Sequence, residues 1–294
     1  MVKESIVFFG SGPVAAKSLG LLAKNFVIEA IITKPATIQE MSAAVMGDIP
    51  AHPVGNKTEL DDLITGTAFN SQLAVLIDFG IIVSQKVIDA FPHGIINSHF
   101  SVLPEWRGAD PISFAILSGQ TKTGVSLMLL DEGMDTGKIL VTKSLPIDPK
   151  DTTPSLTDKL ILLSDSLLTE IIPKYMSGDI TPRQQSHPDR ATYSRKLTKE
   201  DGLIDWSKPA EVLEHEIRAF IEWPKSRTTL ANKEVIITAA HILHESGTVG
   251  VTEVRGKELI VYCGKNALAI DKLKPAGKNE MPAEAFLAGY GSSL

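Results

Sequence analysis

The sequence has little of what disulfide-bonded, metal-binding and membrane proteins need. Its 294 residues include one cysteine, Cys263, which excludes an internal disulfide and a zinc site built from cysteines. The longest apolar runs, such as Leu73–Ile77, are far too short to span a bilayer. Glycine follows at position 10, which leaves no room for the apolar core of a signal peptide. We therefore expect a cytoplasmic protein that holds no metal and binds no membrane.

Excess positive charge is also lacking. The formal net charge is −6; residues 1–180 contain 13 Lys and Arg against 20 Asp and Glu, and residues 181–294 contain 16 against 15. The whole-protein charge therefore does not indicate nucleic acid as a partner, and only the near-neutral C-terminal part is permissive of it. Apolar content of 43% and charged content of 22% are those of an ordinary soluble globular protein. We expect a monomer that does not bind DNA.

The N-terminal part alternates apolar strand-like runs with helical patterns. The strand-like runs are Ser5–Phe9, Phe26–Thr33, Leu73–Ile77, Gly94–Ser98 and the pair Val125–Leu130 and Ile139–Thr142. Helices are predicted at Pro13–Ala23, Ser84–Ala90 and Asp151–Tyr175. Buried strands separated by helices predict βαβ units and a doubly wound, mostly parallel sheet. We expect this α/β domain to cover residues 1–176.

The C-terminal part follows a different pattern. Residues 177–203 are polar, contain Gly and Pro, show no sustained period, and therefore predict a linker. An amphipathic helix is then predicted at Ala210–Phe220. Short strands are predicted at Glu234–Ala239, Thr248–Val254, Glu258–Tyr262 and Ala267–Leu273. Such short, closely spaced strands are typical of a small β-barrel of the OB-like kind, so residues 204–294 are expected to form a smaller β domain.

Two motifs suggest functions that the neighbouring residues do not support. Residues 10–15, GSGPVA, match the dinucleotide fingerprint. However, no acidic residue ends the second strand at Thr33-Lys34, and Glu29 lies in mid-strand. A tight strand-to-helix turn explains the glycines better. His241 and His244 are three residues apart without a third ligand, so surface positions are favoured over a metal site.

Asn97 and His99 stand two residues apart at the end of a predicted strand. Residues i and i+2 of a strand share one face, and the carboxyl edge of an open α/β sheet is where ligands bind. Taken alone, the pair is explained better by a turn cap and a packed histidine than by a catalytic site. Asp135, between Gly133 and Gly137, follows another strand end and is able to reach the same edge.

An amide, an imidazole and a carboxylate at one edge compose an acyl-transfer site without a serine or cysteine nucleophile. The amide and the imidazolium stabilise an oxyanion, and the carboxylate orients and charges the imidazole. The nucleophile must then come from the substrate, most simply as an amine.

The segment 96–112, INSHFSVLPEWRGADPI, followed by DEGMDTG at 131–137, resembles the folate-dependent formyltransferases. These proteins carry an N-x-H-x-S-L-L-P-x-x-R-G segment and a D-T-G loop on a doubly wound domain. The likeness extends over nearly the whole chain, from Phe8 to KLKPAGKNEM at 272–281. It implies an enzyme that transfers a formyl group from 10-formyltetrahydrofolate, the formyl donor, to an amine. By this resemblance Asn97, His99 and Asp135 are the catalytic residues.

The same resemblance implies where the folate binds. The matching segment is S-V-L-P, with valine in place of the first leucine. The residues implied to bind the folate are Ser101, Val102, Leu103 and Pro104, with Ile81, Ile82 and Val83 as walls of the pterin pocket. Asp78 stands in I-D-F-G, where the family often has A-Y-G, and has no implied role.

Several stretches outside the chemistry resemble the branch of this family whose amine substrate is initiator methionyl-tRNA. They are 106–109 (WRGA), 192–206, 219–224 and 274–281. A small β-barrel with a near-neutral to basic face also suits RNA binding. The candidate tRNA contacts are Arg107, Lys196, Lys199, Arg218, Lys225 and Arg227, each explained about as well by a solvated surface position.

One stretch departs from that branch. After the second strand the branch usually carries a long loop rich in Arg and Lys, whereas residues 33–54 here are shorter, with one lysine and two acids. Ile38–Met46 within it is predicted as an amphipathic helix. A sugar-nucleotide N-formyltransferase of the same fold and a catalytically inactive RNA-binding relative therefore remain as alternatives.

Overall fold

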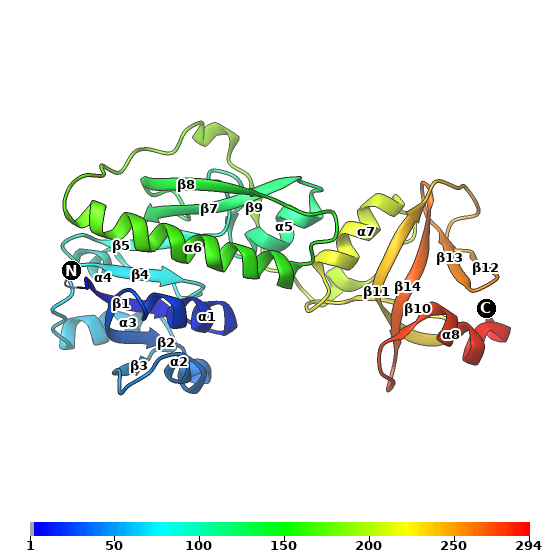
Figure 1. Cartoon of the computed structure of the whole chain (residues 1–294), viewed down its shortest axis with the longest axis horizontal. Coiled ribbons are helices and arrows are strands. Elements are labelled where there is room, and N and C mark those ends of the chain that lie inside the picture. Colours follow the sequence, from blue (N-terminus) through cyan, green and yellow to red (C-terminus); the bar gives the residue numbers. More distant parts are fainter. Residues whose placement is uncertain (1–2) are drawn as a thin grey trace. The chain divides into compact units, whose positions relative to one another are not determined.

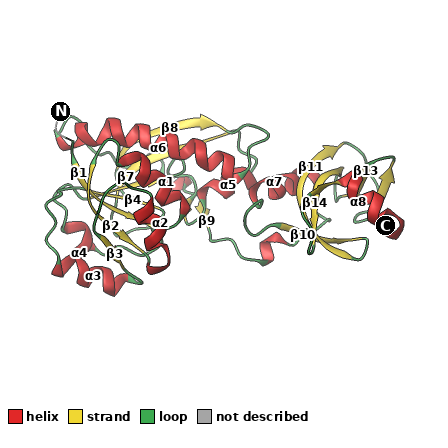
Figure 2. Ribbon diagram, turned by 60° about the horizontal axis from the view of Figure 1, so that its bottom comes forward, coloured by secondary structure: helices red, strands yellow, loops and turns green. Residues whose placement is uncertain are grey.

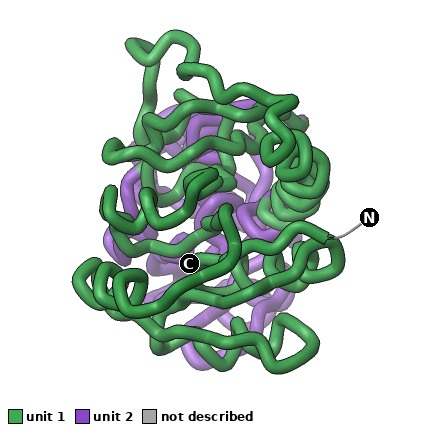
Figure 3. The backbone as a smooth tube through the Cα atoms, turned by 90° about the vertical axis from the view of Figure 1, so that its left-hand side faces the viewer, with its two compact units in different colours: residues 1–111, 122–145, 157–194 green, residues 112–121, 146–156, 195–294 purple. Residues whose placement is uncertain are grey.

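The computed structural model (Figure 1) describes residues 3–294. Helices and strands alternate along most of the first half, whereas strands predominate after α7 (Figure 2). The described chain divides into two compact units (Figure 3). The first comprises residues up to Pro111 together with 122–145 and 157–194, and the second comprises 112–121, 146–156 and 195–294. The segment 177–203, expected as a linker, is thus shared between the two units.

The first unit contains a seven-stranded sheet with the order β3-β2-β1-β4-β5-β7-β8. Its strands are β1 Ser5–Gly10, β2 Val27–Thr33, β3 Ala51–Pro53, β4 Ala74–Ile77, β5 Ile95–His99, β7 Lys122–Leu129 and β8 Ile139–Pro146. The strands from β3 to β5 pair in parallel, whereas β7 runs antiparallel to β5. A separate parallel pair joins β6 Arg107–Gly108 to β9 Tyr193–Ser194. The prediction of a mostly parallel sheet is confirmed.

Helices cover both faces of this sheet. The helices of this unit are α1 Pro13–Leu22, α2 Ile38–Ala43, α3 Lys57–Gly66, α4 Gln85–Asp89 and α6 Thr153–Met176, of which residues 153–156 belong to the second unit. Two short 3-10 turns are η1 Pro35–Thr37 and η2 Pro188–Arg190. Val7 and Phe9 of β1 belong to one buried cluster with side chains of α3 and α4. On the other face, Ser164 of α6 hydrogen-bonds Ser98 of β5 at 2.6 Å between the hydroxyl oxygens. The domain is therefore doubly wound, as predicted.

The strand order reverses beside β1, because β2 and β3 lie on one side and β4 and β5 on the other. In such sheets ligands bind outside the carboxyl ends of the strands near this switch point. The glycine motif forms the turn there: a Cβ at Gly10 would lie 2.5 Å from the Phe8 ring and 2.7 Å from Ala15 Cβ, and Gly12 has φ 88°. The predicted helix Ile38–Met46 is present as α2, which ends at Ala43.

The second unit contains a six-stranded antiparallel sheet with the order β10-β11-β14-β13-β12, in which β15 also pairs with β14. Its strands are β10 Ser226–Leu230, β11 Lys233–Leu243, β12 Thr252–Arg255, β13 Glu258–Tyr262, β14 Ala267–Pro275 and β15 Met281–Pro282. Its helices are α5 Pro111–Leu117, whose first residue belongs to the first unit, α7 Ala210–Ala219 and α8 Ala283–Tyr290. Two 3-10 turns are η3 Glu200–Gly202 and η4 Gly291–Ser293. Leu213 and Ile217 of α7 and Phe286 of α8 pack against the strands in one buried cluster. The predicted smaller β domain is confirmed.

None of the helices between residues 3 and 294 is long and apolar enough to cross a membrane.

Candidate active site

Asn97 and His99 end β5 at the carboxyl edge of the parallel sheet. They are 8% and 6% exposed. Asn97 pairs with Leu76 of β4 on one side and with Met128 of β7 on the other. Ile95, two residues before Asn97, belongs to the buried cluster beneath α3 and α4. Because side chains alternate along a strand, Asn97 and His99 face the same side of the sheet as Ile95.

Asp135 meets both residues from the loop between β7 and β8. Its Oδ1 accepts a hydrogen bond from Asn97 Nδ2 at 3.4 Å, and its Oδ2 lies 3.7 Å from His99 Nδ1. The backbone N–H of Gly108 donates to Oδ2 at 2.7 Å. Asp135 has φ 52°, in the left-handed region that aspartate tolerates better than most residues. The structure therefore brings together the three side chains that the sequence singles out.

The other nitrogen of His99 is held by the backbone. Nε2 lies 3.0 Å from the carbonyl oxygen of Trp106. Because a carbonyl oxygen only accepts, Nε2 carries a hydrogen and donates it. Nδ1 is thus the ring atom left to act on a substrate, and a proton on Nδ1 faces Asp135.

Gln185 supports the Asp135 loop from a distant part of the chain. Its Nε2 donates to the carbonyl oxygens of Asp135 at 2.7 Å and Gly137 at 3.1 Å, and its Oε1 accepts from the Arg107 guanidinium at 2.7 Å. The β6–β9 pair aligns Gly108 with Ser194 and so fixes the N–H that holds Asp135. Sequence reasoning missed Gln185, because it lies in the polar stretch interpreted as a linker and no local pattern marks it.

Three of the six predicted tRNA contacts, all arginines, hydrogen-bond to groups of the protein. Arg107 is 6% exposed and donates to Gln185. Arg218 of α7 pairs with Glu214 at 2.6 Å and donates to the Asp151 carbonyl oxygen at 2.9 Å. The Arg107 and Arg218 guanidinium groups thus already bind acceptors within the protein, and their contact with tRNA stays a prediction. Arg227 is half-buried, and its guanidinium donates to the Lys199 carbonyl oxygen. The remaining candidates are exposed: Lys196, Lys199 and Lys225.

The S-V-L-P segment forms a turn directly after β5. Ser126 of β7 holds this turn, because its hydroxyl donates to the Ser101 carbonyl oxygen at 2.8 Å and accepts the Leu103 N–H at 3.0 Å. Ser101 and Leu103 are buried, whereas Val102 and Pro104 are half-buried. The segment thus offers apolar surface mainly through its second and fourth residues.

The expected pterin wall follows β4, the strand next to β5. Ile81 and Val83 are half-buried and pack against the cluster beneath α3 and α4, whereas Ile82 is 77% exposed. Because β4 and β5 are parallel neighbours, this loop and the S-V-L-P turn emerge at the same edge of the sheet. Both apolar loops therefore lie beside the strand end that carries Asn97 and His99.

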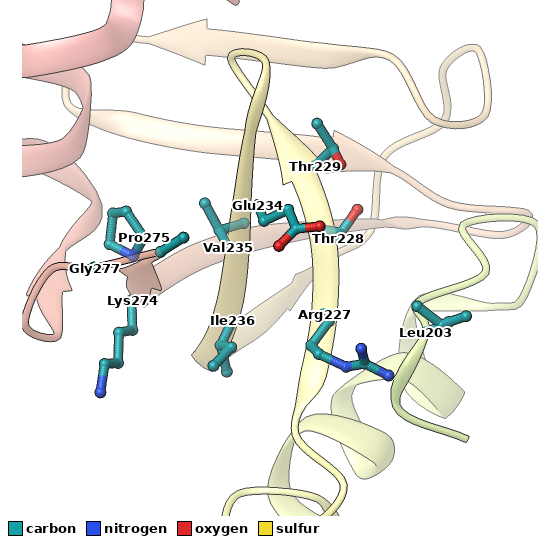
Figure 4. A pocket seen from close by; sticks show the side chains of 11 residues that line it. Leu203, Arg227, Thr228, Thr229, Glu234, Val235, Ile236, Lys274, Pro275 and Gly277 are labelled. Carbon is teal, nitrogen blue, oxygen red and sulfur yellow. The ribbon is translucent and has the colours of Figure 1, made fainter. Parts of the chain in front are cut away.

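The second unit carries a recess of about 320 Å³ on its sheet (Figure 4). The register of β10, β11 and β14 places Arg227, Ile236 and Lys274 side by side, and their side chains project to the same side of the sheet (Figure 4). This face combines two cations with an apolar centre. Elsewhere in the unit, His241 pairs with Asp271 at 2.9 Å. Within residues 3–294 no three His, Cys, Asp or Glu side chains are grouped as metal ligands.

Known proteins match both parts of the chain. Residues 4–172 match the formyl transferase family, and residues 196–291 match the formyl transferase C-terminal domain. A methionyl-tRNA formyltransferase of Trichlorobacter lovleyi is 34% identical over 305 residues, covering 98% of this chain and 95% of that protein. The methionyl-tRNA formyltransferase of Myxococcus xanthus is 34% identical over 304 residues, covering 99% and 96%.

A solved structure shows the same fold at lower identity. The N-formyltransferase from Helicobacter canadensis, in complex with folinic acid and dTDP-3-aminofucose, superposes with a TM-score of 0.67 at 19% identity. The match covers 92% of this chain and 99% of that one. The matched domains and the full-length relatives together show that the chain belongs to the formyl transferase family.

Proposed function

We propose that this chain transfers the formyl group of 10-formyltetrahydrofolate to the α-amine of initiator methionyl-tRNA, giving N-formylmethionyl-tRNA. The meeting of Asn97, His99 and Asp135 at the carboxyl edge of the sheet is the observation that carries the chemistry. The choice of amine rests on the sequence relatives, which are methionyl-tRNA formyltransferases matched over nearly their whole length. The Helicobacter canadensis structure supports the fold, and its low identity does not favour a sugar as the substrate.

The trio stabilises charge and moves a proton. As the substrate amine adds to the formyl carbon, negative charge develops on the formyl oxygen. Asn97 has two amide hydrogens, of which one points to Asp135, so the second is able to donate to that oxygen. His99, fixed through Nε2, offers a proton on Nδ1 as the second donor, and Asp135 stabilises the resulting positive charge. Asp135 then accepts a proton from the substrate nitrogen, which is returned to the leaving nitrogen of the donor.

We assign the folate to the two loops that follow β4 and β5. Exposed Ile82 and half-buried Val102 and Pro104 supply apolar surface at this edge. A flat pterin ring requires such surface beside a few polar groups that orient it. Ser101 and Leu103 support the turn from inside the protein, because both are buried.

We assign the tRNA mainly to the C-terminal part. Residues 1–176 then form the catalytic domain and residues 204–294 the tRNA-contacting domain. The support is the exposure of Lys196, Lys199 and Lys225, and the recess between Arg227 and Lys274. Cations set around an apolar face suit the phosphates and sugars of RNA. We also propose that the protein acts as a cytoplasmic monomer.

A formylation assay tests the proposed function. The protein is given 10-formyltetrahydrofolate with charged initiator tRNA in one reaction and with a nucleotide-linked amino sugar in another. We expect tetrahydrofolate release only with the tRNA. Activity only with the sugar contradicts the proposal, and so does tRNA binding without any release.

Substitution of the oxyanion donors tests the site. We expect Asn97→Ala and His99→Ala each to lower kcat by a factor of about 10² to 10³, because each removes one donor. Circular dichroism checks that both variants fold. Asn25→Ala, at an exposed asparagine of the same unit, is the matched control and should retain full activity. Full activity of a folded Asn97 or His99 variant rules the assignment out.

A further inference from the structure

Trp106 holds a backbone conformation that its bulky side chain disfavours. Its φ is 53°, in the left-handed region, which few residues other than glycine, asparagine and aspartate adopt. Such a conformation persists only where the surrounding structure fixes it. The carbonyl oxygen of Trp106 is also the acceptor that holds His99 Nε2 at 3.0 Å. The groups that fix Trp106 therefore decide where this acceptor points.

The peptide group that follows Trp106 is held at both ends. Its carbonyl oxygen, that of Trp106, accepts from His99 Nε2. Its N–H, that of Arg107, donates to the Thr192 carbonyl oxygen at 2.9 Å. A trans peptide group is planar, so its N–H and its C=O point in opposite directions. Thr192 therefore aims the acceptor of His99 through the other end of the same peptide group.

The peptide group that precedes Trp106 is also held at both ends. Its carbonyl oxygen, that of Glu105, accepts from the Ser101 hydroxyl, and the Trp106 N–H donates to the Thr192 hydroxyl at 2.8 Å. Rotation of this peptide group is what would bring φ of Trp106 back to a negative value. The Thr192 hydroxyl opposes that rotation, because the Trp106 N–H would turn away from it. One residue thus stabilises both the disfavoured φ and the direction of the carbonyl group that follows.

Thr192 reaches this turn from the polar stretch 177–203. Its own N–H donates to the Pro104 carbonyl oxygen at 3.2 Å, and the pairing continues as the two-residue strands β6 and β9. Thr192 is exposed, and Trp106 is half-buried. Water is therefore able to replace the hydroxyl as an acceptor of the Trp106 N–H, but a water molecule does not hold the peptide group in one direction. The hydroxyl contributes direction, because its position is fixed by the backbone of Thr192.

We propose that Thr192 is a positioning residue for formyl transfer, which keeps the Trp106 carbonyl oxygen directed at His99 Nε2. This inference rests on the proposed function. Without the hydroxyl, the left-handed φ of Trp106 favours rotation of the peptide group before it, and the carbonyl group after it loses its fixed direction. The His99 imidazolium that the proposed chemistry uses then loses the acceptor of its Nε2 hydrogen. That acceptor also selects the tautomer of the neutral ring, so more of the neutral ring should carry its hydrogen on Nδ1, beside Asp135.

Steady-state kinetics of Thr192→Val test the proposal, because valine keeps the shape of threonine and lacks the hydroxyl. We expect kcat with methionyl-tRNA to fall about 3- to 10-fold, as the loss of one hydrogen bond implies. The KM for the folate should change little, since the backbone bond to Pro104 remains. Thr192→Ser keeps the hydroxyl and should retain the wild-type kcat. Thr58→Val, at an exposed threonine of α3, is the matched control and should behave as wild type.

Nuclear magnetic resonance of the protein without substrate gives a second measurement. With isotope-labelled histidine, the ring nitrogen shifts show which nitrogen carries the hydrogen, and comparison with His99→Ala identifies the signals of His99. We expect the neutral ring to carry its hydrogen on Nε2 in wild type and in Thr192→Ser. In Thr192→Val the fraction with the hydrogen on Nδ1 should rise.

A second background tests the part played by the left-handed φ. Asparagine tolerates positive φ better than tryptophan does, so Thr192→Val should lower kcat less in a Trp106→Asn protein than in wild type. An equal loss in both backgrounds overturns the inference. So does a wild-type kcat in Thr192→Val, an equal loss in Thr192→Ser, or an unchanged His99 tautomer in Thr192→Val. A wild-type protein inactive on methionyl-tRNA overturns the proposed function instead, and the resonance measurement then still tests the hold on His99.

Discussion

At the scale of single residues, burial and hydrogen bonds leave the side chains of the site little conformational freedom. Asn97 and His99 are buried on a strand, and His99 Nε2 is tied to the Trp106 carbonyl oxygen. Asp135 lies on a loop, yet Gly108 holds its carboxylate and Gln185 holds its carbonyl oxygen. The loop residue is thus fixed by donors from elsewhere in the chain, which preorganises the carboxylate for the proposed chemistry.

Gln185 is therefore predicted to matter for rate as well as stability. Gln185→Ala leaves the carbonyl oxygens of Asp135 and Gly137 and the Arg107 guanidinium without their partner. We expect a loss of about 2 kcal/mol or more in the free energy of unfolding. We expect kcat to fall between about 10- and 100-fold, because small displacements of a reacting group cost that much. Denaturant unfolding and steady-state kinetics measure the two effects.

A fall in kcat without a change in the KM for the folate identifies a positioning role for Gln185. The KM for the folate should change little, since Gln185 is not part of the loops assigned to it. A folded Gln185→Ala protein with wild-type kcat would show that the Asp135 loop does not need this support.

At the scale of elements, predictions succeeded where the apolar pattern was strong. β13 has the predicted bounds Glu258–Tyr262, and α7 differs from the prediction by one residue at its end. The helix α3 was missed, although Asn56 caps it and Glu59 hydrogen-bonds back to the chain before it. Its apolar face rests on Leu60 and Ile64. With so few apolar residues, the helix owes its stability to tertiary packing rather than to a periodic pattern.

The turn η3 of the second unit should stabilise that unit in a pH-dependent way. Hydrogen bonding from Arg195, together with Thr198, lowers the pKa of Asp201 below its usual value despite partial burial. A carboxyl group with a lowered folded-state pKa stabilises the fold above its unfolded value of about 4, and this stability is lost as the pH falls toward the folded value. Asp201→Asn should therefore lower Tm at pH 7 and have less effect at pH 3.

Calorimetry at both pH values checks this prediction. Asp189→Asn, at an exposed aspartate in the turn η2, is the control and should change Tm little at either pH. An equal loss of Tm at pH 3 and pH 7 for Asp201→Asn would mean that its charge does not contribute.

At the scale of the whole molecule, a protein with net charge −6 is proposed to bind a polyanion. Such binding must rely on local cationic faces, because the overall field is repulsive. The loop after β2 carries a short helix and one lysine instead of a basic stretch. The second unit supplies cationic groups instead. They are its exposed lysines and the two cations beside the recess, Arg227 and Lys274.

Lys274→Ala tests this distribution of charge. We expect weaker tRNA binding and a decrease of about 1 in the slope of log K against log salt, because one phosphate contact is lost. The measurement is a titration with tRNA at several salt concentrations. Lys265→Ala, an exposed lysine just before the other end of β14, is the control and should leave the slope unchanged. An unchanged slope for Lys274→Ala would remove the recess from the tRNA surface.

The sequence by itself determined the fold class, the strand that carries Asn97 and His99, and the glycine-bounded loop of Asp135. These features are local, because apolar periodicity and turn residues depend on neighbours along the chain. Only the tertiary structure decided that Gln185 braces the Asp135 loop and that Arg107 and Arg218 are engaged internally. Burial and hydrogen-bond partners arise between residues far apart in sequence, and the register of neighbouring strands sets which of them meet.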